Sequence, residues 1–283
     1  MAILAAVFLF LLGALAAPAH TTSESKYEPI KPRQTCGHVI DGVGTFMESA
    51  VYTFEGDTLP AGLLASTDQL IPDEQWGAPF NHFFDSSNVA VQDGFAEVRV
   101  PGGQDPSSDP QRAIHSGEIF TLESQILYAS VRTAAILSTE PGTCQGLFFY
   151  KSENQETDIE YLSDINSLSN IGWEDGPPPL HYTNQAVLEG GEKSWTRGPT
   201  PADVSSVHWY RIDWTPDYTA FFVDDVEQRR HTENVPSVPG TWLWNNWSNG
   251  DPGWSVGPPL GDSALKIQTI EMYYNTSSSS TGC

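Results

Sequence analysis

Hydrophobic and polar residues alternate in short runs along most of the chain, and turn residues separate these runs. In 88–100, an Asp93-Gly94 pair divides two alternating stretches, which predicts a β-hairpin. No amphipathic pattern predicts a helix longer than about ten residues. Many short strands with regular turns indicate an all-β protein, an antiparallel β-sandwich of jelly-roll type. Further strands are predicted at 125–137, 147–150, 156–162, 209–214, 219–224, 241–247 and 265–274.

The N-terminal segment differs from this pattern. Residues 2–17 are apolar and uncharged, and Ala14-Leu15-Ala16 fits a signal-peptidase site. The run is too short to span a bilayer comfortably. We therefore expect a secreted protein. The C-terminal residues contain no apolar stretch and no lipid-anchor signal, so we expect no membrane anchor. The expected organisation is a signal peptide (1–16), a polar leader (17–45), a jelly-roll domain (46–275) and a Ser-rich tail (276–283).

Charge excludes two classes of partner. The 283 residues include 13 Lys and Arg against 36 Asp and Glu, so the formal net charge is −23. A nucleic-acid or anionic-lipid partner needs clustered basic residues, and neither is expected here. With 39% hydrophobic and 11% aromatic residues, the chain has the material for one large folded core.

Export leads to an oxidising compartment, where cysteines can pair. Three cysteines, Cys36, Cys144 and Cys283, allow three alternative single bridges, and we favour Cys36–Cys144. Two glycosylation sequons begin at Asn246 and Asn275. We expect Asn275 to be the modified one, because Asn246 lies inside an aromatic segment.

The segment 155–162 carries the candidate chemistry. Side chains of a strand alternate between its two faces, so Glu156, Asp158 and Glu160 share one face while the intervening residues suit a core. Successive carboxyls on that face stand about 6.6 Å apart at Cα. Like charges this close repel one another, and we expect one or more of the pKa values to rise.

Glycoside hydrolysis uses two carboxyls with opposed roles, one attacking the anomeric carbon and one protonating the leaving oxygen. In retaining enzymes these carboxyls stand about 5–5.5 Å apart. Glu156 and Glu160 are about 13 Å apart at Cα in a regular strand, and inward-leaning side chains can reduce the carboxyl separation to about 6 Å. The spacing is compatible with a retaining mechanism, with Asp158 tuning its neighbours. A solvated acidic strand face is the alternative.

Here the sequence resembles family 16 of the glycoside hydrolases. Glu156-Thr157-Asp158-Ile159-Glu160 looks like its E-x-D-x-E signature, and the resemblance extends from about Phe84 to Tyr274. Segments 88–98, 207–224 and 236–254 match, in order, the family's early hairpin, its "FHxYxxDWxP" stretch and the "PSTPG…NLWNG…W" stretch of bacterial lichenases.

The resemblance implies a jelly roll with a concave cleft. It assigns Glu156 as nucleophile, Asp158 as the assisting acid and Glu160 as general acid/base. It also places five residues in sugar subsites: Phe148, Tyr150, Tyr182, Asn245 and Trp247. Aromatic rings suit the apolar faces of pyranoses, and ordinary sheet packing is the alternative for each of them.

The sequence departs from the lichenase pattern at three places. Asn154 and Gln155 stand where lichenases have Trp and Asp, and Glu118 in Gly117-Glu118-Ile119 stands where a cationic residue is frequent. The polar segment 163–179 is an insertion that we expect to border the acidic strand. These changes leave the linkage specificity open.

The leading interpretation is a secreted, monomeric, retaining endo-β-glucanase acting on β-1,3/1,4- or β-1,3-glucan. A cell-wall transglycosylase using the same carboxylates is the first alternative. A non-catalytic glycan-binding module is the second, and the presence of all three acids argues against it. No cofactor is required and no metal ligands are assigned, although the resemblance allows a structural Ca²⁺.

Overall fold

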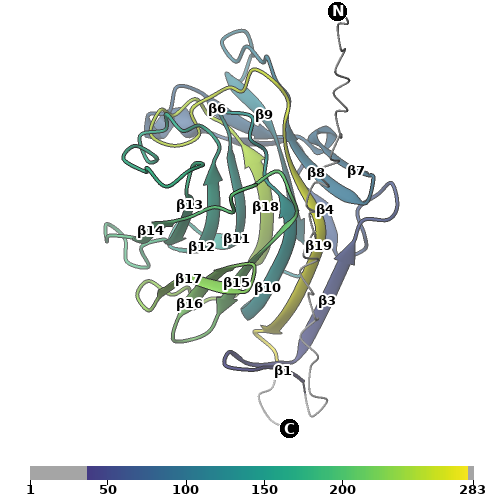
Figure 1. Ribbon diagram of the computed structural model, residues 1–283. Coiled ribbons are helices and arrows are strands. Elements are labelled where there is room, and N and C mark those ends of the chain that lie inside the picture. The colour runs from purple at the N-terminus through teal and green to yellow at the C-terminus, as the bar shows by residue number, and fades with distance from the viewer. Residues whose placement is uncertain (1–36, 280–283) are drawn as a thin grey trace, which may run out of the picture. The chain divides into compact units, whose positions relative to one another are not determined.

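The computed structural model describes residues 37–279, which form two large β-sheets, one separate two-stranded hairpin and two short 3-10 helices (Figure 1). The all-β, antiparallel architecture predicted from the sequence is confirmed. The predicted signal peptide, most of the predicted leader and residues 280–283 lie outside the described residues.

One sheet carries the acidic strand. Its order along the sheet is β14 (Ser194–Gly198), β13 (Leu180–Asn184), β12 (Gln155–Leu162), β11 (Cys144–Ser152), β18 (Thr241–Trp247), β9 (Ala113–Thr121), β6 (Asn81–Phe84) and β5 (Gln69–Ile71), with β4 (Leu63–Ala65) also paired to β9. The β6–β9 pair is parallel, and the other strand pairs of this sheet are antiparallel.

The second sheet is antiparallel throughout its described pairs. Its order is β17 (Val226–His231), β16 (Thr219–Val223), β15 (His208–Trp214), β10 (Ile126–Ile136), β19 (Ser263–Thr276), β8 (Phe95–Val100) and β7 (Val89–Gln92), with β3 (Glu48–Thr53) also paired to β19. The remaining elements are a hairpin, β1 (His38–Ile40) and β2 (Gly44–Phe46), and the 3-10 helices η1 (Asp73–Trp76) and η2 (Ser86–Asn88). Among the described residues, no helix is long and apolar enough to cross a membrane.

The hydrophobic core lies between the two sheets. Ile159 and Tyr161 of β12 pack into it from the first sheet, and Val131 of β10 and Ile212 of β15 from the second. The indole Nε1 of Trp244 donates to Thr133 Oγ1 across the core at 2.9 Å, so the polar atom of this large buried ring is satisfied. Burial of one face of β12 here fixes its other face, which carries the acids, toward the outside of the sandwich.

The strands predicted from alternation are present with small shifts of their ends. The predicted hairpin is β7–β8, in which Gln92 faces Phe95 and the turn residues Asp93 and Gly94 have φ of 52° and 81°. Positive φ at both turn positions matches the twist of the flanking strands. The short strands at 38–84 and β9, β13, β14 and β17 were not predicted.

The C-terminal strand β19 has three partners. One of its edges pairs with β10, and its other edge pairs first with β8 and then with β3. Asn275 lies in this strand. Its side chain accepts from Met47 N at 2.9 Å and donates through Nδ2 to Thr45 O at 3.2 Å. Glycosylation at Asn275 stays a prediction, although Nδ2, the atom that would carry the glycan, is engaged.

Asn246 links the two sheets and provides a test of the packing. Its buried Nδ2 donates to Val98 O of β8 and to Ser263 O of β19, both at 3.1 Å. Asn246→Ala leaves these acceptors without a partner, and we expect it to lower the free energy of unfolding by about 2–3 kcal/mol. Urea unfolding measures the change. Asn166→Ala, at an exposed asparagine, is the control and should leave stability nearly unaltered. Equal effects of the two substitutions would contradict the cross-sheet role.

Candidate active site

The three acids of β12 lie together in a cleft. β12 pairs with β11 without interruption through this region, so that Glu156 faces Tyr150, Asp158 faces Phe148 and Glu160 faces Gly146. All three carboxyls line a cavity of about 580 Å³ on the outer face of the sheet. The regular strand therefore places them on one face, as the sequence predicted.

Burial sets the protonation of these acids. Burial, followed by the charges of Glu160 and Glu153, raises the pKa of Glu156 to about 8, and Asp158 and Lys193 act in the opposite direction. Burial and then the charge of Glu156 hold the pKa of Asp158 well above its usual range. Burial likewise raises the pKa of Glu160. At neutral pH the cluster therefore holds fewer than three negative charges.

This proton distribution suits opposed roles. The raised pKa of Asp158 favours its protonated form, which can donate a hydrogen bond to Glu156; that bond lowers the pKa of Glu156 and so increases the fraction of Glu156 that is ionised. Glu160, with a raised pKa, can hold a proton for donation. The arrangement can therefore supply one attacking carboxylate and one acid from a single strand.

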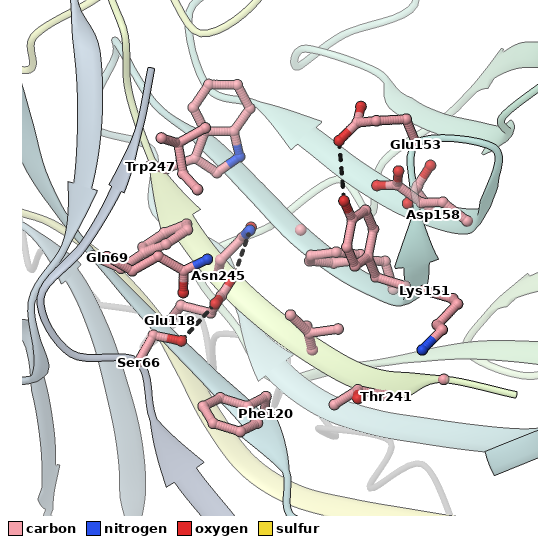
Figure 2. Close-up of a pocket in the computed structure, with 18 of the residues that line it drawn as sticks. Ser66, Gln69, Glu118, Phe120, Lys151, Glu153, Asp158, Thr241, Asn245 and Trp247 are labelled. Atoms are coloured by element: carbon pink, nitrogen blue, oxygen red, sulfur yellow. Dashed lines mark hydrogen bonds between the residues drawn. The ribbon is translucent and has the colours of Figure 1, made fainter. Parts of the chain in front are cut away.

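A fourth carboxyl, Glu118 of β9, lies in the same cleft. Figure 2 shows it between Ser66 and Asn245, which donate to its two oxygens at 2.6 and 3.3 Å. Burial raises the pKa of Glu118 to about 7, and the two donors oppose the shift. From the sequence, Glu118 was noted only as a departure from a cationic pattern. Ser66 and Asn245 are far from Glu118 in the sequence, so no local sequence pattern indicates these contacts.

Four of the five predicted subsite residues line the cleft, and one does not. Phe148 and Tyr150 of β11 and Asn245 and Trp247 of β18 border the cavity. Tyr182 was placed wrongly: it pairs with Ile159, is fully buried in the core and packs against Phe221 at 5.2 Å between ring centroids. Its position could have been found, because Leu180 and Tyr182 alternate with polar residues in 180–184, a pattern that turns the apolar side chains inward.

Gly146 of β11 forms part of the floor between Glu160 and Asn245. A Cβ at this position would lie 2.7 Å from Asn245 Oδ1. The absence of a side chain therefore allows Asn245 to approach the row of acids closely. Asn246, between Asn245 and Trp247, points into the core, because successive side chains of a strand alternate between its faces.

A His–Asp pair that was not predicted from the sequence also lines the cleft. His82 Nδ1 lies 2.5 Å from Asp73 Oδ2, and the imidazole stacks on Trp247 with the ring centroids 4.7 Å apart. Both residues of the pair line the cavity, together with Trp76 of η1. The pair fixes the orientation of the imidazole beside a ring predicted to bind sugar.

Cys144 also lies beside the acids. Its thiol is free and fully buried, and it donates to Glu160 Oε1 at 3.2 Å. The predicted partner, Cys36, lies outside the described residues. Because the Cys144 thiol is free, the favoured Cys36–Cys144 bridge is not formed in this structure. The strand directs the Cys144 side chain to Glu160 instead.

Two further expectations concern the insertion and a metal. The segment 163–179 joins β12 to β13, and Asn170 Nδ2 donates to Leu162 O at the end of β12 at 3.1 Å, so the segment does border the acidic strand. Within residues 37–279, no group of three or more His, Cys, Asp or Glu side chains is arranged to hold a metal ion. A structural Ca²⁺ stays a prediction without assigned ligands.

Comparisons with known proteins agree with this geometry. The sequence model described as "Glycosyl hydrolases family 16" matches residues 79–252. A β-glucanase of Acetivibrio thermocellus is 41% identical over 194 residues, which cover 65% of this chain and 51% of that protein. A xylanase/β-glucanase of Ruminococcus flavefaciens is 25% identical over 180 residues, 60% of this chain and 21% of that protein. The chain spans about half or less of the length of the curated relatives it matches.

The fold is also found among solved structures. A Bacillus licheniformis β-glucanase superposes with a TM-score of 0.60 at 17% identity, covering 81% of this chain and 98% of the other. At this identity the likeness shows the fold, a jelly roll.

The pKa of Glu118 predicts how stability depends on pH. Because its pKa is raised from 4.5 to about 7, ionisation opposes folding, and stability is lost as pH rises through this interval. The glutamine of Glu118→Gln cannot ionise. The free energy of unfolding of the variant, relative to that of the wild type, should therefore increase by about 1.4 kcal/mol per pH unit between about pH 5 and 7. Urea unfolding of both proteins at pH 5, 6 and 7 measures this difference. A difference that does not change with pH would contradict the assignment.

Proposed function

The chain belongs to glycosyl hydrolases family 16, and from this we propose that it is a retaining endo-β-glucanase that cleaves β-1,3/1,4- or β-1,3-glucan by double displacement. The observation that carries the proposal is the row of Glu156, Asp158 and Glu160, which share one face of a regular strand and line one cleft. The names of the curated relatives, several of them β-glucanases, support this substrate class.

The first half of the reaction uses all three acids. Glu156, as carboxylate, attacks the anomeric carbon and forms a glycosyl ester as the bond to the leaving oxygen breaks. Glu160 gives its proton to that oxygen, and the shortened chain leaves. Asp158 holds its proton toward Glu156, which keeps the attacking oxygen available at a pH where three adjacent charges could not coexist.

In the second half, Glu160 is ionised and takes a proton from water, whose oxygen attacks the same carbon. The ester to Glu156 breaks, and the sugar is released with its original anomeric configuration. A sugar hydroxyl in place of water gives transglycosylation, so the same residues serve either outcome. The proposed reaction needs no cofactor, because carboxyl groups supply both nucleophile and acid.

The cleft offers groups suited to a neutral polysaccharide. Phe148, Tyr150 and Trp247 present aromatic rings, and Asn245 and Glu118 present polar atoms. Rings cover the apolar faces of pyranoses, and the polar atoms bond their hydroxyls. We further propose that the enzyme is exported, on the basis of the apolar segment 2–17, which lies outside the described residues, and that it acts as a monomer.

A product assay tests the reaction. Protein is incubated with barley mixed-linkage glucan, lichenan and laminarin, with and without labelled oligosaccharide acceptors, and the products are sized by mass. New reducing ends and shorter chains are expected. Label in longer chains without new reducing ends would indicate a transglycosylase, and glycan binding without either product would indicate a binding module.

Glu156→Gln tests the nucleophile. Because the amide cannot form the glycosyl ester, we expect activity below about 1% of wild type with the fold retained, as checked by circular dichroism. Glu227→Gln, at an exposed acid on the opposite sheet, is the matched control and should keep wild-type activity. More than a few per cent of activity in Glu156→Gln on every cleaved glucan would show that another group attacks.

Azide distinguishes the roles of the two glutamates. With an activated aryl glycoside, Glu160→Ala forms the ester but deprotonates water poorly, so added azide should restore turnover and give the β-glycosyl azide. Glu156→Ala with azide should give the α-glycosyl azide, because azide then replaces the enzyme carboxylate. Nuclear magnetic resonance of the products reads the configuration. The opposite pairing of variant and product would reverse the two assignments.

A further inference from the structure

Two hydrogen-bond donors meet at one oxygen of Glu160. Cys144 Sγ of β11 lies 3.2 Å from Glu160 Oε1, and Trp254 Nε1, from the segment between β18 and β19, lies 3.3 Å from the same oxygen. Neither donor is assigned a role by the proposed reaction. Their convergence leaves the second oxygen, Oε2, without a contact from either of them.

Both groups act as donors throughout the working pH range. An indole N–H can only donate. Burial, followed by the charge of Glu160, raises the pKa of the Cys144 thiol well above its usual range, so the thiol keeps its hydrogen. An oxygen that accepts two hydrogen bonds is a poor site for a further proton. The acid proton of Glu160 therefore belongs on Oε2.

Resting on the proposed function, we propose that Cys144 and Trp254 are positioning residues that hold Glu160 Oε1 and direct the acid proton to Oε2, toward the leaving oxygen. They touch the carboxyl and not the substrate. The insertion 163–179 completes the device, because it holds the segment that carries Trp254.

The contacts of the insertion are specific. Ser167 Oγ and Ser169 Oγ donate to Gly253 O at 3.2 and 2.8 Å, and Leu168 N donates to Pro252 O at 2.9 Å. These three bonds fix the backbone immediately before Trp254. The insertion 163–179, which has no lichenase counterpart in the sequence, therefore holds the Trp254 indole in position.

His181 of β13 also packs against the indole. Its ring lies 5.1 Å from that of Trp254, and its Nε2 is 2.9 Å from Asn170 Oδ1 of the insertion. Burial, then the charges of Arg197 and Lys193, lowers the pKa of His181 to about 3. The imidazole is therefore neutral, and it supports the indole without adding a charge near Glu160.

The charges around Glu160 decide the direction of the expected effect. Glu156 and Asp158 precede it on the same face of β12, and Lys193 lies over the Trp254 ring, 5.1 Å from its centroid. Neutral His181 faces Glu160 from β13, with Arg197 of β14 beyond it. Burial raises the pKa of Glu160, and the bonds from Cys144 and Trp254 lower it. Loss of either donor should therefore raise this pKa further.

The test compares Cys144→Ala, which removes the donor, with Cys144→Ser, which keeps one. The pH profile of kcat/KM on a soluble glucan is measured for both and for the wild type. Because Glu160 acts as an acid, activity falls above its pKa, and we expect this basic limb to move up by about half to one pH unit in Cys144→Ala. Cys144→Ser should keep the wild-type limb. Trp254→Phe should resemble Cys144→Ala.

A second readout separates positioning from a general loss of structure. A glycoside with an activated aryl leaving group needs no acid, whereas a glucan does. Cys144→Ala should lower kcat on the glucan about tenfold and leave the aryl glycoside nearly unchanged. Equal losses on both substrates, or a Cys144→Ala profile equal to that of Cys144→Ser, would overturn the proposal.

The outcomes also distinguish this proposal from the proposed function. If wild-type protein cleaves no glycan and no aryl glycoside, the proposed function fails and this proposal fails with it. If the wild type cleaves glucan and Glu156→Gln does not, while Cys144→Ala keeps the wild-type profile, only the role of Cys144 and Trp254 is rejected.

Discussion

Three carboxyl groups lie side by side on β12, one buried and two partly buried, and removing them from water opposes folding. The other face of the strand provides the compensation, since Ile159 and Tyr161 are buried in the core and both edges of the strand are paired. Unbroken pairing with β11 and β13 leaves the strand little freedom to relieve the repulsion by bending. The charge is instead reduced by proton retention, and this is the state that a reaction requiring one acid and one carboxylate can use.

The acidity of the protein fits the kind of ligand proposed for it. With a net charge of −23, the molecule repels anions, but a polysaccharide without charged groups is not affected by that field. Recognition can then depend on rings and hydrogen bonds, such as those offered by Trp247, Asn245 and Glu118. Lys193 is the basic residue whose charge acts on all three acids, and its exposure keeps that influence moderate.

Local periodicity predicted much of the fold and the central part of the site. Residues two apart in a strand share a face, so the alternation placed the three acids on one face of their strand and Asn245 with Trp247 on one face of theirs. Each of these placements depends on one segment of the sequence only. The predicted subsite position of Tyr182 was wrong because it followed the family resemblance, whereas the alternation in 180–184 indicated that this side chain faces the core. The Cys36–Cys144 bridge was predicted from the number of cysteines alone, and that number does not locate the thiols in space. The Ser66–Glu118–Asn245 and Asp73–His82 contacts depend on how distant segments pair, and a single sequence does not specify this pairing.

The position of β19 has a consequence for how the molecule is made. This strand completes the middle of its sheet, with β10 on one edge and β8 and β3 on the other, yet it is formed by residues 263–276. Its pairing with β3 joins positions more than two hundred residues apart, and contacts of such separation slow folding. While the ribosome is still adding the preceding residues, β3, β8 and β10 have no common partner. The sandwich therefore closes only after residues 263–276 have been synthesised, and until then the nascent chain exposes strand edges to solvent and to chaperones.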